Sequence, residues 1–350
     1  MNPKISLIFA CYNVANYLPA LFELLNKQTY NNIEIIFVED CSTDNKTREL
    51  LRNFKTKHTV ILIENEKNIG VGYSRNKGIE IATGDYIGFP DPDDLFELDW
   101  ISQVALAIEE KQPDVIISGI REEYEDDLSN IIYSKDILSQ YSGYIESKQQ
   151  DVLVDLEEKL LFGYTNNKFY RKCILTNINL KYKNMALKED LEFNYHFFLK
   201  AHNFYILNQP YYIYKKRNNS SLTAKYVKEY FNIHMDTIFM LNDLFSKKGN
   251  LTNKATQLLV NHFYRYFLSA VERNTSPLSK MSFRQQINWV NQVKNNKRYE
   301  EFFRKQNLLT GKMKYISKLF TSDIATVSVG YIVALIKKYL PIIFTKLKQN

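Results

Sequence analysis

Cysteine, metal-ligand histidine patterns and long apolar runs are all scarce in this sequence of 350 residues. The three cysteines, Cys11, Cys41 and Cys173, are odd in number and widely spaced, so they form neither a disulfide framework nor a zinc pattern. The five histidines have no metal-ligand spacing. We therefore expect reduced thiols in a cytoplasmic protein. The apolar N-terminal segment is too short for a secretory leader, so it is interpreted as a first strand.

Two glycine-rich nucleotide-binding fingerprints are also missing. The dinucleotide fingerprint G-x-G-x-x-G would follow the first strand, where this chain has "ACYN" at 10–13. The phosphate loop G-x-x-x-x-G-K-[ST] does not occur. No long low-complexity tract is present. A composition of 45% hydrophobic and 24% charged residues is typical of a folded protein.

Charge is divided unevenly along the chain. Residues 226–350 carry 20 Lys and Arg against 7 Asp and Glu, whereas residues 1–225 carry 26 against 32. An acidic front and a basic rear predict two parts with different tasks. A chain of this length also accommodates two domains. We expect one domain over 1–225 and a basic helical region over 226–350.

The front of the chain alternates between strand and helix patterns, which predicts an α/β fold with a mainly parallel sheet flanked by helices. Strands are expected at 4–13, 32–44, 59–65, 85–94 and 114–120, with helices at 14–28, 45–57, 70–84 and 99–112. Residues 121–150 are polar and acidic and predict a loop or hairpin over a crevice. Further helices are expected at 151–163, 167–175 and 185–203, then a late strand from 204.

Polar clusters follow three of the predicted strands, and open sheets bind ligands beyond their carboxyl ends. The cluster "PDPDD" contributes Asp91, Asp93 and Asp94. Two carboxylates at a strand exit can share Mg²⁺ or Mn²⁺, which prefer oxygen ligands and bridge phosphate oxygens. The alternative is an acidic turn that favours the N-terminus of the next helix.

The three clusters are "ACYN", "VEDCSTD" and "PDPDD", and structural alternatives of the same kind exist for "VEDCSTD" and for the helix entrance at "NIGVGYSRNKG". In "VEDCSTD", Asp40 can accept a hydrogen bond from a base or a ribose, while Asp44 or Ser42 can cap the next helix. The segment "NIGVGYSRNKG" supplies glycines at a helix entrance, a site for polar ligand groups. Its Arg75 can pair with an acid of the crevice or act as a structural clamp.

Together these segments resemble family-2 inverting glycosyltransferases of the GT-A fold, of the capsular or cell-surface polysaccharide type. The resemblance rests on "SLIFACYN", "VEDCSTDN", "NIGVGYSRNKGIEIATGDYIGFPDPDD", "NKFYRK" and "KEDLEF". It is strong to about residue 120 and weak to about 222. It implies a nucleotide-binding half at 1–120 and an acceptor-binding half at 121–225. The chain departs from the common "PTYN" and "DDGSTD" at "ACYN" and "EDCSTD", but it keeps Asp40.

The resemblance implies roles for individual residues. Ala10, Asp40, Asn68, Arg75 and Asp91 look like nucleotide-site residues, with Arg75 as a brace. Asp93 looks like the protein ligand of the metal, shared with Asp91, and Asp94 looks like support for the loop or the donor sugar.

Inversion needs a base that takes the proton of the acceptor hydroxyl, and the family places it in an acidic pair before a helix. Here that pair is Glu189 and Asp190, of which we favour Asp190; the alternative is that both acids only favour the helix N-terminus. Arg217 and Ser221 resemble a late segment that closes over the diphosphate or acceptor, and a surface loop is the alternative.

The basic C-terminal segment from 326 onward is interrupted by Lys337, Lys338 and Pro341 before it reaches the roughly 20 apolar residues of a span. A helix lying on an anionic membrane surface and a helix packed on the protein or on a partner subunit are both open. No nucleic-acid-binding module accompanies the charge.

The sequence therefore predicts a metal-dependent inverting glycosyltransferase that acts in polysaccharide biosynthesis, cytoplasmic or peripheral at the inner membrane face. Its expected partners are a UDP-sugar donor, a Mn²⁺ or Mg²⁺ ion and a glycan or lipid-linked acceptor. No Q-x-x-R-W sequence and no series of transmembrane helices is present, which favours addition of a single sugar. A homo-oligomer stays open. The alternatives are a nucleotidyltransferase, which would need a Gly-rich basic loop after the first strand, and a non-catalytic glycan-binding or scaffold protein.

Overall fold

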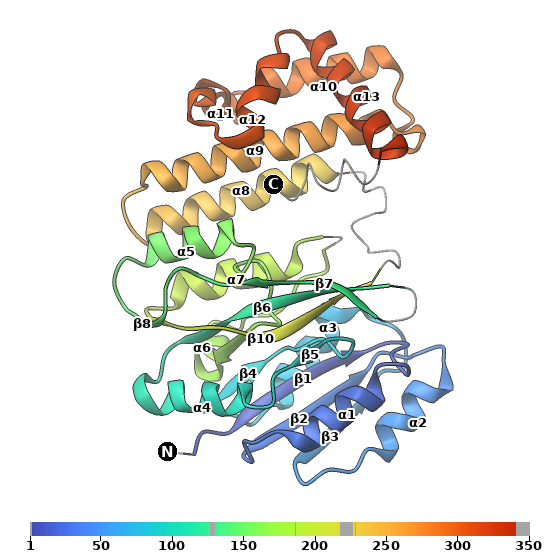
Figure 1. Ribbon diagram of the computed structural model, residues 1–350, viewed down its shortest axis with the longest axis vertical. Helices are drawn as coiled ribbons and strands as arrows, with labels where there is room; N and C mark the ends of the chain where they lie inside the picture. The colour runs from blue at the N-terminus through green and yellow to red at the C-terminus, as the bar shows by residue number, and fades with distance from the viewer. Residues whose placement is uncertain (1, 127–129, 186, 218–226, 228, 341–350) are drawn as a thin grey trace. The chain divides into compact units, whose positions relative to one another are not determined.

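The computed structural model describes residues 2–126, 130–185, 187–217, 227 and 229–340. The chain divides into two compact units, residues 1–219 with 246–249, and residues 220–245 with 250–350. The first unit contains a mixed sheet flanked by helices, and the second is helical (Figure 1). The predicted α/β fold with a C-terminal helical region is confirmed.

Four parallel strands form one half of the sheet, in the order β3-β2-β1-β4. They are β1 (Ile5–Cys11), β2 (Ile33–Glu39), β3 (Thr59–Glu64) and β4 (Tyr86–Gly88). All of β2 and most of β1 are buried, which explains their nearly continuous apolar sequences. Three helices connect these strands: α1 (Leu18–Lys27), α2 (Asn45–Asn53) and α3 (Val71–Ile81).

Helix α3 lies close to β1 because Gly78 has no side chain. A Cβ at Gly78 would lie 2.4 Å from Cγ2 of Ile8, closer than packed atoms come. This close packing fixes the helix that carries Arg75 against the central strand.

The other half of the sheet mixes parallel and antiparallel pairs. Strand β9 (Lys168–Arg171) is antiparallel to both β4 and β6 (Val115–Glu125), and β6 is parallel to β10 (Phe204–Lys216). The short strands β5 (Leu95–Phe96), β7 (Ile131–Ile137) and β8 (Gly143–Ile145) complete it. Its helices are α4 (Trp100–Lys111), α5 (Gln149–Glu158), α6 (Lys172–Asn177) and α7 (Glu189–Lys200).

The segment 167–175 departs from its predicted helix. Residues 168–171 form β9, and only 172–177 are helical. Phe169 and Tyr170 are fully buried in the strand, between β4 and β6. Two flanking strands with open hydrogen-bonding edges outweigh local helix propensity here. The segment 121–150 contains a hairpin, because β6 runs on to Glu125 and pairs with β7.

The second unit is built from helices around an aromatic core. They are α8 (Tyr230–Lys247), α9 (Asn253–Asn274), α10 (Phe283–Lys294), α11 (Glu300–Arg304), α12 (Gly311–Ile316) and α13 (Asp323–Tyr339). The ring of Phe231 lies 5.4 Å from the rings of Trp289 and Tyr299, centroid to centroid. Within the described part of the chain, every helix is too short or too polar to cross a membrane.

Candidate active site

The acidic loop after β4 brings Asp91 into contact with three distant segments. Asp91 Oδ1 accepts a hydrogen bond from Arg75 Nη2 at 2.7 Å, and Oδ2 accepts one from Asn166 Nδ2 at 3.1 Å. The backbone N–H of Asp91 donates to the hydroxyl of Tyr212 in β10 at 3.1 Å. These contacts hold the Asp91 carboxylate in place, with 31% of the side chain still exposed.

Arg75 bridges this loop to the start of α7. Its Nη1 donates to Asp190 Oδ1 at 2.8 Å, while Nη2 serves Asp91. The guanidinium is 5% exposed and lies over the ring of Tyr182, 5.3 Å from its centroid. Burial by itself would lower the pKa of Arg75, but Asp190, Tyr182 and Asp91 outweigh it and raise that pKa well above its usual value. Arg75 is therefore a fixed positive charge between two carboxylates.

Asp190 lies in the first turn of α7, beside Glu189. Burial is the main cause that raises the pKa of Asp190; Arg75 opposes it, and Asp91 adds to it. Burial and the neighbouring Asp190 also raise the pKa of Glu189. The Asp190 side chain is nevertheless 30% exposed, so a small molecule can reach it. A carboxylate with a raised pKa and an accessible face has the properties of a general base.

Asp93 and Arg217 meet at the tip of the acidic loop. Arg217 Nη2 donates to the backbone oxygen of Asp93 at 2.8 Å, and Nη1 lies 3.4 Å from Asp93 Oδ2. Arg217 also donates from Nε to Glu125 at 3.1 Å and lies over the ring of Tyr17. Burial and then Asp91 raise the pKa of Asp93. Its side chain is 45% exposed, which makes it the most accessible acid of the loop.

Asp94, the next residue of the loop, is buried. It accepts hydrogen bonds from the Tyr212 hydroxyl at 2.7 Å and from the backbone N–H of Lys215 at 2.9 Å. Burial, with Asp91 and Asp93, raises the pKa of Asp94 well above its usual value. These contacts join the loop to β10.

Asp40 lies at the end of β2, and its carboxylate is already occupied by a neighbouring loop. Oδ1 accepts from Asn65 Nδ2 at 2.8 Å and from the backbone N–H of Ile69 at 2.9 Å. Oδ2 accepts from the backbone N–H of Gly70 at 2.8 Å. Asp40 thus shapes the turn that leads into α3. Its own N–H donates to the carbonyl of Cys11, which sets it beside the end of β1.

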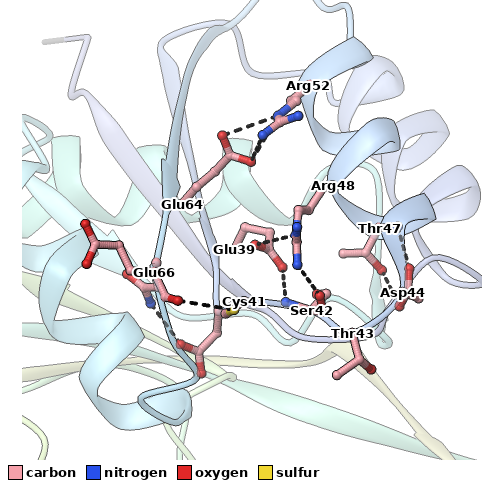
Figure 2. A network of polar contacts seen from close by, with 12 residues as sticks. Glu39, Cys41, Ser42, Thr43, Asp44, Thr47, Arg48, Arg52, Glu64 and Glu66 are labelled. Carbon is pink, nitrogen blue, oxygen red and sulfur yellow. Dashed lines mark hydrogen bonds and ion pairs between the residues drawn. The ribbon is translucent and has the colours of Figure 1, made fainter.

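The turn from β2 into α2 is held by a second polar network (Figure 2). Glu39, which is buried, accepts from the backbone N–H of Ser42 at 2.6 Å and forms an ion pair with Arg48 at 3.5 Å. Asp44 caps α2 by accepting from the backbone N–H of Thr47 at 2.6 Å. Asp44 therefore has the capping role that the sequence left open between it and Ser42.

The predicted residues fall into three groups in space. Direct hydrogen bonds join Arg75, Asp91 and Asp190, while the same short loop carries Asp93 and Asp94 with Arg217 against it. Ala10, in β1, is paired with Val38 of β2, so it lies near Asp40 in the sheet. Asn68 is exposed, and Asn65 is the residue that contacts Asp40. Ser221 lies outside the described residues.

Sequence reasoning missed Asn166 and Tyr212, both of which contact Asp91. Neither follows an acidic cluster or a glycine turn, so local pattern gave no signal for them. Asn166 does precede "NKFYRK", a segment with recognisable family character. No group of three or more His, Cys, Asp or Glu side chains able to hold a metal is found among the residues that the structure describes.

Known proteins share this sequence and this architecture. Residues 6–176 match the model of the family described as Glycosyl transferase family 2. EpsH of Bacillus subtilis, a protein named as a glycosyltransferase, is 29% identical over 254 residues, which are 71% of each chain. A crystal structure of S. aureus TarS 1-349 in complex with UDP-GlcNAc superposes with a TM-score of 0.65 at 21% identity, covering 94% of this chain and 91% of TarS 1-349.

A more distant structure has the same fold. The mannosyltransferase PcManGT from Pyrobaculum calidifontis, in complex with GDP-Man and Mn2+, superposes with a TM-score of 0.50 at 12% identity, covering 96% of this chain and 88% of PcManGT. At these identities the two structures establish the fold alone, whereas the family model speaks for residues 6–176. Residues 6–176 are therefore a glycosyltransferase family 2 domain, and the chain has a GT-A fold.

Proposed function

We propose that this protein transfers a single sugar, with inversion, from a UDP-sugar to a hydroxyl group of a cell-surface glycan or a lipid-linked acceptor. The observation that carries the proposal is the bridge from Asp91 through Arg75 to Asp190. It sets a carboxylate at the strand exit, where GT-A ligands bind, opposite a second carboxylate with a raised pKa. An inverting transfer needs this pairing of a leaving-group site with a base.

In the proposed reaction, Asp190 accepts the proton of the acceptor hydroxyl. The acceptor oxygen forms a bond to the anomeric carbon while the bond from that carbon to the diphosphate oxygen breaks. The electron pair of the breaking bond leaves with the nucleoside diphosphate. Arg75 orients Asp190 through Oδ1 and keeps the carboxylate beside a positive charge. Glu189 is a candidate for support, since it neighbours Asp190 and also has a raised pKa.

The acidic loop fits a divalent cation such as Mn²⁺ or Mg²⁺. Asp91 and Asp93 offer accessible carboxylate oxygens, the ligands that such ions prefer. Burial is the main cause that raises the pKa of Asp93, and the neighbouring Asp91 adds to it with negative charge that a cation would offset. When bound, the ion would supply positive charge to the departing diphosphate. The Mn2+ in the PcManGT complex supports the assignment. Arg217 lies against the same loop and is a candidate to stabilise the diphosphate.

We propose that Ala10, Asp40 and Asn68 form one edge of the nucleotide site. UDP-GlcNAc in the TarS complex supports UDP as the nucleotide. Both carboxylate oxygens of Asp40 accept hydrogen bonds from the loop that leads into α3. Asp40 would therefore contribute to base binding by fixing the shape of that loop. We further propose that residues 226–350 form a region with a task of its own, because it is helical where described and strongly basic.

The test is transfer and hydrolysis of a panel of UDP-sugars with Mn²⁺, for the wild type and Asp190→Asn. We expect the variant to lose about 10²-fold or more in turnover while it still binds UDP. Asp236→Asn, which changes an exposed acid of α8, is the matched control and should keep full activity. Unchanged turnover in Asp190→Asn would remove Asp190 as base. Activity that survives complete chelation would remove the metal.

A further inference from the structure

Helix α13 has an apolar stripe on its exposed side. The exposed side chains follow one another at intervals of seven, one, three and four residues, which places them on one helix face. They are Ile324, Tyr331, Ile332, Leu335 and Tyr339. Ile332 and Leu335 are each 54% exposed, and Tyr339 is 66% exposed. All of these side chains except Tyr331 are more than half exposed, so this face of the helix leaves apolar surface in contact with water.

The opposite side of α13 provides its packing. Thr326, Val327 and Gly330 are buried there, and Gly330 lies so close to α9 that a Cβ would be 2.7 Å from Cγ1 of Val271. The helix is therefore anchored by one face and leaves its second apolar face open to an external partner.

Lysines are numerous in this part of the chain, although Lys337 is paired with Glu272 of α9 at 3.1 Å. Between residues 311 and 340 there are five lysines and one acid, Asp323, which is paired with Lys294 at 3.1 Å. The five lysines are Lys312, Lys314, Lys318, Lys337 and Lys338. Lys338 lies over the ring of Tyr339, and Lys318 lies over the ring of the exposed Tyr315. Lysine and tyrosine beside exposed aliphatic residues are typical of helices that lie at a lipid headgroup layer.

We propose that this face of α13 binds the surface of an anionic lipid bilayer. The apolar stripe would enter the headgroup boundary, and the lysines would contact acidic headgroups. A symmetric contact with a second copy of the chain is disfavoured, because an isologous interface would set lysines against lysines. Since the surface does not include the catalytic residues, it adds a membrane contact to the sugar chemistry proposed above.

Flotation of the full chain with vesicles tests this surface. We expect binding to vesicles that contain phosphatidylglycerol, weak binding to pure phosphatidylcholine, and loss of binding as salt rises to about 0.5 M. The double variant Ile332→Ser with Leu335→Ser should bind at least about tenfold less, because two large apolar side chains no longer leave water. Leu106→Ser, an equally exposed leucine of α4, is the matched control and should bind as the wild type does.

Three results would overturn the proposal. They are no binding of the wild type to acidic vesicles, binding of the double variant equal to that of the wild type, or a wild-type dimer in light scattering that is absent in the double variant. Hydrolysis of a UDP-sugar without lipid should be the same in wild type and double variant. A chain that lacks this hydrolysis but floats would contradict the proposed transfer and leave the lipid surface standing.

Discussion

Asp190 is held by a hydrogen bond of 2.8 Å from Arg75, a residue 115 positions earlier in the chain. The same guanidinium reaches Asp91, so one side chain fixes the relative position of two carboxylates from separate segments. The guanidinium is planar and carries two Nη atoms, so it can donate to both carboxylates in one fixed geometry, whereas the ammonium group of a lysine cannot span both acids. The geometry of the proposed base thus depends on a residue that need not touch the substrate.

Two variants of Arg75 test separately the effect of its positive charge and the effect of its two hydrogen bonds to Asp91 and Asp190. Arg75→Lys keeps the positive charge but loses the two-pronged contact, and we expect the rate of transfer to fall about 10²-fold with the fold retained. Arg75→Met also leaves two carboxylates without their counter-charge, so it should bind the donor more weakly and unfold at lower urea concentration. Initial rates and urea midpoints measure the two effects.

Arg52→Gln provides the control for these variants, because it removes an arginine from an exposed ion pair of α2 with Glu64. It should change neither quantity measurably. If Arg75→Lys transfers sugar at the wild-type rate, the bridge does not position the base.

The pH dependence of transfer follows from the raised pKa of Asp190. Below this raised pKa the carboxyl is protonated and cannot accept a proton, so kcat/KM should rise with pH above the usual Asp value of 3.8 until Asp190 ionises. The effect of pH on stability has the opposite direction. Because the folded state binds this proton more tightly than the unfolded state, the contribution of Asp190 to the free energy of unfolding is lost as pH rises. Relative to Asp190→Asn, the wild type should therefore lose stability over the same interval.

Both signs are measurable on one pair of proteins. A rate profile of the wild type gives the ionisation, and urea unfolding of wild type and Asp190→Asn at each pH gives the difference in stability. A wild-type rate that is flat from pH 4 upward would contradict the assignment, since only an ordinary or lowered pKa produces it.

The sequence located the acids but not the contacts that orient them. Alternating strands and helices predicted that Asp40 and Asp91 would lie at one edge of the sheet, because parallel strands end together there. The contact of Asn166 with Asp91 depends on β9, whose four residues carry no periodicity of their own. Strands β4 and β6 decide that segment, and pairing partners so distant in the chain are invisible to a local pattern.

Asp40 should prove to be a residue that shapes the nucleotide site through its loop. Asp40→Asn replaces one acceptor oxygen with an N–H group, which would then face a backbone donor of Ile69 or Gly70. We expect a loss of about 1–3 kcal/mol in the free energy of unfolding and weaker binding of UDP. Asn68→Ala, on the exposed part of the same loop, should weaken UDP binding without this loss of stability. Calorimetric titration and urea unfolding separate them, and a fully stable Asp40→Asn would contradict the role of the loop.

Lys168, the first residue of β9, is fully buried. Its Nζ donates to the carbonyl of Leu161 at 2.6 Å, to the carbonyl of Tyr164 and to Oδ1 of Asn167 at 2.9 Å. These bonds close the turn that precedes Asn166. Burial lowers the pKa of Lys168 from 10.5 to about 7, against the opposing effects of Asp190 and Glu157.

Between pH 7 and 10.5 the unfolded chain therefore binds a proton at Lys168 that the folded chain has released, so stability rises with pH there. Lys168→Met has a side chain of similar length and removes the pH dependence of stability that comes from this amino group. The stability of the wild type relative to the variant should increase from pH 7 to pH 9 by up to about 1.4 kcal/mol per unit. Urea unfolding at several pH values measures the difference. A difference that stays constant would mean that Lys168 keeps its ordinary pKa, with the ammonium fully solvated by its carbonyl partners.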